Sequence, residues 1–324
     1  MGKKSGKKRH GLLKAAAAGI GIAAAATGGE IAYFYRRTMK RGKAKTERTI
    51  KMAGTDWNQY MDLIQERKTA MLARPHSDLW QESYDGLKLH ATYFPTEAAE
   101  KKKIVICFHG YTSQGLADYI GLSDYYQKRG FAMLLPDARA HGLSEGEYIG
   151  FGCLDRKDAL VWIDWVIKEL GEDVEILLHG TSMGAATLLM LSGLALPEQV
   201  KGIVSDCGFT SPKEVFTHVL HSMYHLPSFP VIPGADVVNR RLAGYGMDEC
   251  NAKREVEKAT VSILFIHGSA DTFVPCSMCD EIYEHCASPK RKLIVEGAAH
   301  AESYYKDMES YEKELTEFIA ETMG

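Results

Sequence analysis

The chain has 324 residues, of which 45% are hydrophobic and 25% are charged, and its formal net charge is −3. This composition is ordinary for a globular protein with a substantial core. The charge is unevenly distributed, because residues 1–51 carry +12 and the remaining residues carry −15. An acidic body argues against nucleic acid as a partner, since phosphate binding needs a basic face.

The N-terminal segment, residues 1–50, contains an apolar stretch from Leu12 to Tyr35 that one Lys and one Glu interrupt. Its length fits a membrane-spanning helix of about 20 residues, although many Ala and Gly residues make it weakly hydrophobic. The aromatic cluster Tyr33–Tyr35 and the two arginines after it favour a single membrane anchor, and so membrane association through the N-terminus. A signal peptide cleaved near Ala24–Ala26 and a soluble or surface-lying helix are the alternatives.

Basic residues are similarly abundant on both sides of this stretch, so they do not decide which side of the membrane the body faces. The seven cysteines are an odd number and are scattered through the body. Such a pattern fits buried, reduced thiols better than a disulfide framework. It favours a body on the cytoplasmic side.

Residues 51–78 connect this segment to the body. Trp57, Tyr60, Met61 and Ile64 recur at helical spacing, which predicts a linker helix packed on the body.

The body, residues 79–324, has the pattern of a layered α/β protein. Two β-rich runs flank the turn Asp85-Gly86 and predict an antiparallel hairpin. Six apolar runs then alternate with helical patterns: Ile104–His109, Phe131–Asp137, Val174–His179, Gly202–Asp206, Ser262–His267 and Lys292–Glu296. Apolar strands separated by helices are typical of a parallel sheet covered on both faces. We expect a doubly wound, mostly parallel sheet that begins with the antiparallel hairpin.

The stretch Gly180–Gly184 reads Gly-Thr-Ser-Met-Gly and matches the pattern G-x-S-x-G. It lies between a predicted strand and a predicted helix, where such a serine occupies a strained turn and is exposed for nucleophilic attack. Ser182 is therefore the candidate nucleophile.

A serine nucleophile needs a base, and the base needs an acid that orients it. In this fold the three residues follow the chain order Ser, acid, His. Asp271 follows the strand Ser262–His267, and His300 follows the last predicted strand. Both lie at the sheet edge that carries Ser182, so we expect them to be the acid and the base.

The rival acids are Asp206 and Asp137, and the rival base is His267. Asp206 would have to reach across an additional strand, and Asp137 shares its loop with Arg139, a suitable structural partner. His267 sits directly at a strand end, where it is less free to turn toward the serine.

Acyl transfer also needs two backbone N–H groups that bind the developing oxyanion. Met183 directly follows the nucleophile, and Tyr111 follows His109-Gly110 after a predicted strand. We expect these two residues to form the oxyanion hole.

On these motifs, the chain from Leu79 to Met323 resembles the α/β-hydrolase superfamily. The stretches PDARAHGLSEG, GTSMGAATLL, FIHGSADTFVP and EGAAHAESY are most similar to its bacterial serine-aminopeptidase-like and fermentation-respiration-switch-like branch. The resemblance implies hydrolysis of an ester, a thioester or an amide.

The region from about 211 to 257 is too long for a plain connection between two strands. We expect a helical cap insertion that covers the serine and forms a pocket for the acyl or leaving group. The candidate lining residues are Phe216, Met223, Tyr224 and Phe229. Packing of these residues against the sheet helices is the alternative.

Two groups of potential metal ligands have simpler explanations. His218, His221 and His225 share a helical face, but no carboxylate joins them at ligand spacing. Cys276, Cys279, His285 and Cys286 also follow helical spacing, and small buried residues on an inward face explain them. We expect no metal and no cofactor.

The sequence thus predicts a serine hydrolase that cleaves an ester of a small-molecule acyl substrate through an acyl-enzyme intermediate. Thioesterase or acyltransferase activity and serine aminopeptidase activity are the alternatives among enzymes. A membrane-tethered binding protein on an inert hydrolase fold is the alternative outside enzymes. No feature of the sequence indicates an oligomeric state.

Overall fold

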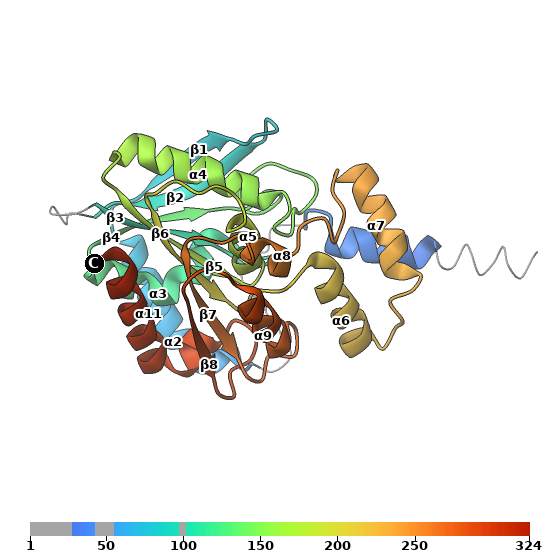
Figure 1. Ribbon diagram of the computed structural model, residues 1–324. Coiled ribbons are helices and arrows are strands. Elements are labelled where there is room, and N and C mark those ends of the chain that lie inside the picture. Colours follow the sequence, from blue (N-terminus) through green and yellow to red (C-terminus); the bar gives the residue numbers. More distant parts are fainter. Residues whose placement is uncertain (1–27, 43–54, 97–101) are drawn as a thin grey trace, which may run out of the picture.

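The computed structural model describes residues 28–42, 55–96 and 102–324. An eight-stranded sheet lies at its centre in the order β1-β2-β4-β3-β5-β6-β7-β8 (Figure 1). The strands are β1 Ser77–Glu82, β2 Lys88–Phe94, β3 Lys103–Phe108, β4 Phe131–Pro136, β5 Glu175–Thr181, β6 Val200–Asp206, β7 Ser262–Gly268 and β8 Lys290–Val295. Strand β2 is antiparallel to β1 and β4, and all other pairs are parallel. The predicted mixed, doubly wound sheet with an N-terminal hairpin is confirmed.

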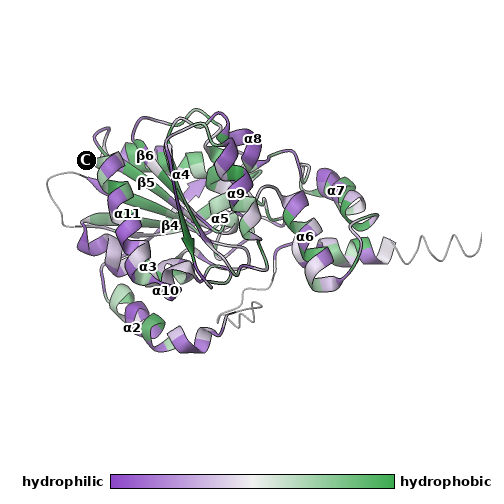
Figure 2. Cartoon of the chain, turned by 60° about the horizontal axis from the view of Figure 1, so that its bottom comes forward, coloured by the Kyte–Doolittle hydropathy of each residue, from purple (hydrophilic) through white to green (hydrophobic). Residues whose placement is uncertain are grey.

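The strands at the centre of the sheet are buried along almost their whole length, as their apolar sequences require. Successive residues of β3 face opposite sides, so Ile104 and Ile106 join one core and Val105 and Cys107 join the other. Strand β8 forms an edge, and its burial alternates. Hydrophobic residues gather between the layers, and the outer helix faces are hydrophilic (Figure 2).

Helices cover both faces of the sheet. One face carries η1 Trp57–Tyr60, α2 Met61–Leu72, α3 Gly115–Lys128, α10 Ser303–Lys306 and α11 Met308–Met323. The other carries α4 Asp155–Leu170, α5 Met183–Leu191, α8 Ala252–Val256 and α9 Cys276–His285. Helix α2 is held by Arg67, which donates to the carbonyl of Gly121 and to the Tyr304 hydroxyl.

Two helices between β6 and β7 stand outside these layers, α6 Pro212–Tyr224 and α7 Val231–Leu242 (Figure 1). Helix α6 begins at Ser211, whose hydroxyl accepts from the Glu214 amide, with Pro212 in the first turn. It ends at His225, which adopts a left-handed conformation with φ of 53°. The helical residues 28–38 lie beside α7, and together with α6 and α7 they form a lobe outside the layers.

The predicted membrane localisation through a single-pass anchor is wrong. Among residues 28–42, 55–96 and 102–324, no helix combines the length and the apolar character needed to cross a membrane. Most of the predicted span lies in residues 1–27, outside the described residues. At its other end, Phe34 and Tyr35 are 8% and 3% exposed, because they pack against the protein rather than against lipid.

All seven cysteines lie within the described residues and are free thiols. Six of them are buried, and Cys276 is partly exposed. The structure therefore contains no disulfide among its described residues, as the odd and scattered cysteines predict.

Candidate active site

Ser182 stands on a sharp turn between β5 and α5. Its backbone has a φ of 54° and a ψ of −110°, a conformation that non-glycine residues rarely adopt. The turn is held in place by the Ser182 amide, which donates to the Asp206 carbonyl at 2.8 Å. Helix α5 begins immediately afterwards, so its N-terminus points at the serine.

The two glycines of the motif are required by close backbone approach. A Cβ on Gly184 would overlap the carbonyl oxygen of Phe108 at the end of β3. A Cβ on Gly180 would overlap the backbone of Gly184 and Ala185. These glycines let α5 pack tightly against β3 and β5, and this packing sets the position of Ser182.

The structure brings Ser182, His300 and Asp271 together. Ser182 Oγ lies 2.8 Å from His300 Nε2, and His300 Nδ1 lies 2.6 Å from Asp271 Oδ2. The three residues come from the ends of β5, β7 and β8, which meet at one edge of the sheet. Ser182 is 5% exposed, His300 is 1% exposed and Asp271 is 6% exposed, so bulk water barely screens their interactions.

The second oxygen of Asp271 is also occupied. Asp271 Oδ1 accepts from the amides of Phe273 and Val274, both at 2.9 Å. Burial by itself raises the pKa of Asp271, but the imidazoles of His300 and His267 outweigh burial and hold that pKa well below its usual value. The carboxylate is therefore ionised at neutral pH and can orient and stabilise a charged His300.

The rival residues make other contacts. His267 Nε2 lies 2.9 Å from the Val274 carbonyl and 3.4 Å from Asp271 Oδ2, so it adjoins the acid rather than the serine. Asp206 accepts from the Tyr311 hydroxyl at 3.1 Å, and burial raises its pKa to about 6.

The remaining rival acid, Asp137, pairs with His90 at 2.8 Å. Its neighbour Arg139 instead bridges Asp158 and Asp85. These contacts tie β2, the loop after β4 and helix α4 together.

The loop after β3, which carries Tyr111, runs directly beside the nucleophile. A Cβ on Gly110 would be 3.4 Å from the Ser182 Cβ. The residues on both sides of Tyr111 are fixed, because the Gly110 amide donates to Asp118 at 2.7 Å and the Thr112 amide donates to His141 at 3.3 Å. Gly110, the neighbour of Tyr111, and Met183, the first residue of α5, thus flank Ser182 from two segments.

The four candidate pocket residues separate into two groups. Phe216 is 6% exposed and packs edge-on against the Phe151 ring at 4.9 Å. Met223, Tyr224 and Phe229 are 48%, 55% and 73% exposed and lie at the outer end of α6 and in the segment after it.

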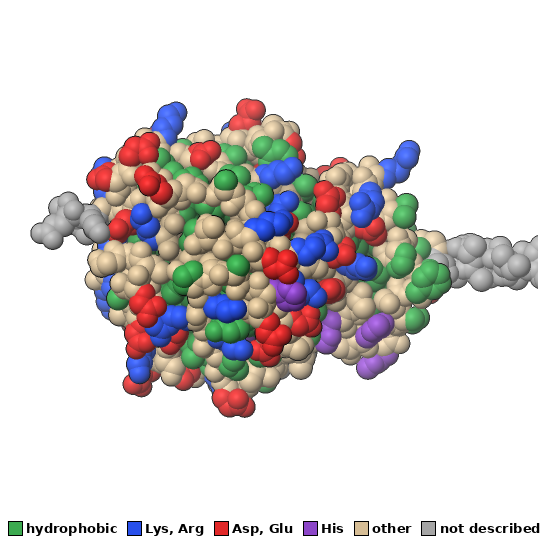
Figure 3. Space-filling model, in the orientation of Figure 1, with side chains coloured by type: hydrophobic (Ala, Val, Ile, Leu, Met, Phe, Trp, Pro, Cys, Tyr) green, Lys and Arg blue, Asp and Glu red, His purple; other side chains and the backbone are tan. Residues whose placement is uncertain are grey.

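The histidines of α6 have separate partners. His218 Nε2 lies 3.0 Å from the carbonyl of Thr272, next to Asp271, whereas His221 accepts from the Ser228 amide at 3.2 Å. His225 is the left-handed residue that ends the helix. Histidine side chains gather on the surface of this lobe (Figure 3).

One group of ligand-type atoms comes together among the described residues. Atoms of Cys207, Asp271 and His300 lie within 4.8 Å of one another. Burial raises the pKa of the Cys207 thiol well above its usual value, which opposes the thiolate that a metal requires. Asp271 and His300 also bind each other, so this donor set fits a proton-transfer site better than a metal site.

Two parts of the site were not predicted from the sequence. The Phe273 ring lies 5.0 Å from the His300 ring and shields it on one side. The helical residues 28–38 pack next to the loop that carries Tyr111, although their aromatic residues resemble those of a membrane interface. The sequence carried no signal that separates the two, because the apolar helical face of Ile31, Phe34 and Tyr35 suits lipid and protein alike.

Comparison with known proteins places this fold in a family. A family model for the alpha/beta hydrolase fold matches residues 103–237. The uncharacterized protein YqkD of Bacillus subtilis is 31% identical over 216 residues, which cover 67% of this chain and 70% of YqkD. The chain belongs to the α/β-hydrolase family. The Escherichia coli K12 protein YfhR, also uncharacterized, is 21% identical to this α/β hydrolase over 74% of the chain and 79% of YfhR.

Solved structures share the fold. The Pyrococcus furiosus esterase Pf2001 superposes with a TM-score of 0.65 at 22% identity, over 79% of this α/β hydrolase and 94% of the esterase. Est1E of Butyrivibrio proteoclasticus, solved with ferulic acid, superposes with a TM-score of 0.59 at 18% identity, over 76% and 99% of the two chains. At these identities the likeness concerns the fold.

Proposed function

We propose that the protein is a serine hydrolase that cleaves ester bonds of small-molecule acyl substrates. The observation that carries the proposal is the continuous contact from Ser182 Oγ to His300 Nε2 at 2.8 Å and from His300 Nδ1 to Asp271 at 2.6 Å. Membership of the α/β-hydrolase family and an esterase among the structural neighbours support the same reaction class.

In the first half of the reaction, His300 Nε2 takes the Ser182 proton while Oγ attacks the acyl carbonyl. The carbonyl oxygen becomes an oxyanion, to which the backbone N–H groups of Met183 and Tyr111 donate hydrogen bonds. The protonated His300 is stabilised by the ionised Asp271. The oxyanion then collapses to a carbonyl, the bond between the acyl carbon and the alcohol oxygen breaks, and His300 donates its proton to the departing alcohol. The product of this half is an acyl ester of Ser182.

In the second half, water replaces the alcohol. His300 takes a proton from that water, whose oxygen attacks the acyl-enzyme carbonyl and forms the oxyanion again. The Ser182 Oγ–acyl bond then breaks, and His300 returns its proton to Oγ. The carboxylic acid leaves, and the residues regain their starting protonation states.

The test is hydrolysis of p-nitrophenyl esters of increasing chain length by the full-length chain and by Ser182→Ala. We expect the substitution to lower kcat by roughly four to six orders of magnitude with every ester, because it removes the nucleophile. Normal hydrolysis by Ser182→Ala would refute the assignment.

Acyl-CoA thioesters and aminoacyl amides, assayed in parallel, separate the related activities. A kcat/KM that is higher for either class than for esters by tenfold or more would replace the esterase proposal with a thioesterase or an aminopeptidase. Absence of turnover with all three classes would favour a binding protein on an inert fold.

A further inference from the structure

Residues 28–42 form an integral part of the lobe beside the site, not a separate tail. A Cβ on Gly234 of α7 would collide with the Ile31 side chain, so the two helical segments are in close contact. The Phe34 ring packs edge-on against Phe216 of α6 with ring centroids 5.6 Å apart. The Tyr35 hydroxyl donates to Asn239 of α7 at 3.3 Å.

The same segment reaches the loop that carries the proposed oxyanion donor. The Tyr111 hydroxyl donates to the Arg37 carbonyl at 3.2 Å. The Tyr111 ring packs on Phe151 at 5.3 Å, and Phe151 packs on Phe216 at 4.9 Å. Aromatic contacts therefore run without a break from Tyr111 through Phe151 and Phe216 to Phe34.

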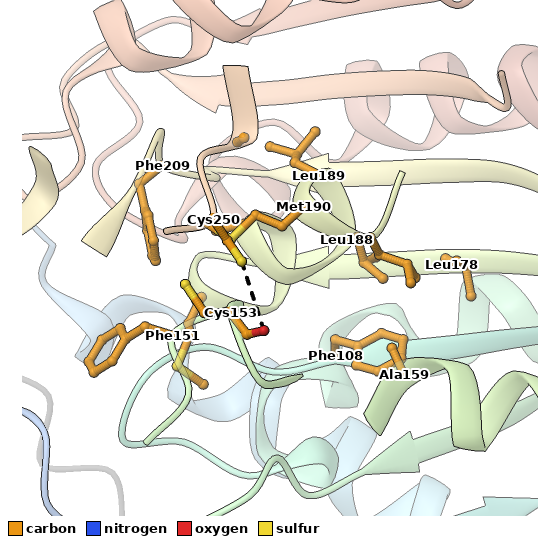
Figure 4. Close-up of a cluster of buried hydrophobic side chains, with 14 of the residues drawn as sticks. Phe108, Phe151, Cys153, Ala159, Leu178, Leu188, Leu189, Met190, Phe209 and Cys250 are labelled. Carbon is orange, nitrogen blue, oxygen red and sulfur yellow. Dashed lines mark hydrogen bonds between the residues drawn. The ribbon is translucent and has the colours of Figure 1, made fainter. Parts of the chain in front are cut away.

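Phe151, the middle of this chain of rings, is itself firmly seated. It is 3% exposed and belongs to the buried cluster that includes Cys153 and Phe209 (Figure 4). Movement of Tyr111 would therefore have to disturb either this core or residues 28–42. The segment is the partner that contributes Phe34 and the Arg37 carbonyl.

The C-terminal end of the segment is also anchored to the body. Met39 is fully buried, and its carbonyl accepts from the Ile149 amide at 2.9 Å. The Arg41 amide donates to the Glu147 carbonyl at 2.8 Å, and the Arg41 guanidinium donates to the Gly142 carbonyl at 2.7 Å. Contacts at both ends hold the segment against the body.

We propose that residues 28–42 position the oxyanion hole, with Phe34 and the Arg37 carbonyl as positioning groups that act through Tyr111. This inference rests on the proposed function. An oxyanion donor must meet the developing charge within a narrow distance, and a displaced donor loses transition-state stabilisation more than substrate binding. Disturbance of the segment should therefore lower kcat and leave KM nearly unchanged.

The test compares Phe34→Ala with Tyr33→Ala in the full-length chain. Tyr33 is the adjacent residue of the same helical turn but is 70% exposed, so its truncation leaves the packing in place. Phe34→Leu keeps a large apolar side chain at this position, unlike Phe34→Ala. It reports whether lost packing at residue 34, rather than misfolding, causes any loss of kcat. Urea denaturation shows that each variant is folded under the assay conditions.

Two measurements are made on each variant. Hydrogen exchange of residues 109–113 and 149–153 should be faster in Phe34→Ala than in the wild type, and unchanged in Tyr33→Ala. Hydrolysis of a p-nitrophenyl ester should show kcat reduced about tenfold in Phe34→Ala with KM within about twofold, as expected for a displaced oxyanion donor. Phe34→Leu should recover most of the lost kcat.

Unchanged exchange in Phe34→Ala would overturn the coupling of the segment to the loop. Faster exchange with a wild-type kcat would overturn the positioning role alone. A wild-type protein that hydrolyses no ester and reacts with no fluorophosphonate would instead refute the proposed function, and the inference with it. Ester hydrolysis by the wild type thus distinguishes failure of the positioning inference from failure of the proposed function.

Discussion

Asp206, a buried residue next to the site, should make the protein less stable as the pH rises from 4 to 8. Burial raises its pKa from 3.8 to about 6, and the Tyr311 hydroxyl donates to one of its oxygens. Well below pH 3.8 the carboxyl is protonated in both the folded and the unfolded chain, so its titration does not change the free energy of unfolding there. As the pH rises, the unfolded chain ionises first, and the free energy of unfolding falls until about pH 6.

A pKa difference of this size corresponds to roughly 3 kcal/mol, because one pKa unit is worth about 1.4 kcal/mol. Asp206→Asn removes the titration while its amide oxygen still accepts from Tyr311. Relative to the wild type, the variant should therefore gain about 2 to 3 kcal/mol in unfolding free energy between pH 4 and pH 8.

Urea denaturation of both proteins at a series of pH values measures this gain, and any constant effect of the substitution cancels. Asp173→Asn is the matched control, because the Asp173 side chain is 78% exposed. The two proteins differ in free energy of unfolding, and the measured quantity is the change in this difference between pH 4 and pH 8. A change below about 0.5 kcal/mol would show that Asp206 is ionised in the folded protein over this range. Burial would then not raise the pKa of Asp206 in the folded protein.

Two further predictions address the serine and the acid. Gly184→Ala should slow fluorophosphonate labelling of Ser182 and lower the unfolding free energy by about 1 to 3 kcal/mol, because the new Cβ overlaps the Phe108 backbone, which no side-chain rotation relieves. Gly29→Ala, which has open space around its Cβ, is the control, and equal effects of the two substitutions would contradict the packing argument. Asp271→Asn should lower kcat for ester hydrolysis by roughly 10³ to 10⁴ at pH 7, since an amide neither orients nor stabilises the His300 imidazolium; a loss below about tenfold would point to another acid.

The sheet and the close contacts at its edge follow from local sequence patterns. Apolar runs bounded by Gly define the parallel strands, and the strands carry Ser182, Asp271 and His300 to one edge regardless of the details of helix packing. The G-x-S-x-G pattern constrains backbone geometry directly, because its two glycines are the positions where a side chain does not fit. The sheet and the contacts of Ser182, Asp271 and His300 at its edge could therefore be predicted from the sequence.

The lobe beside the site could not be predicted from local sequence patterns. An apolar aromatic face such as that of Ile31, Phe34 and Tyr35 suits a membrane and a protein surface equally well, so only its partners decide between them. The orientation of α6 likewise depends on contacts with residues far away in sequence. These contacts bury Phe216 and leave Phe229 exposed.

The measurement that tests the central claim most directly is the site and rate of fluorophosphonate modification, followed by mass spectrometry on the wild type and on His300→Ala. We predict a single adduct on Ser182 in the wild type and a labelling rate at least 100-fold lower in His300→Ala, because His300 supplies the base. Labelling at another residue, or equal rates in the two proteins, would contradict the account.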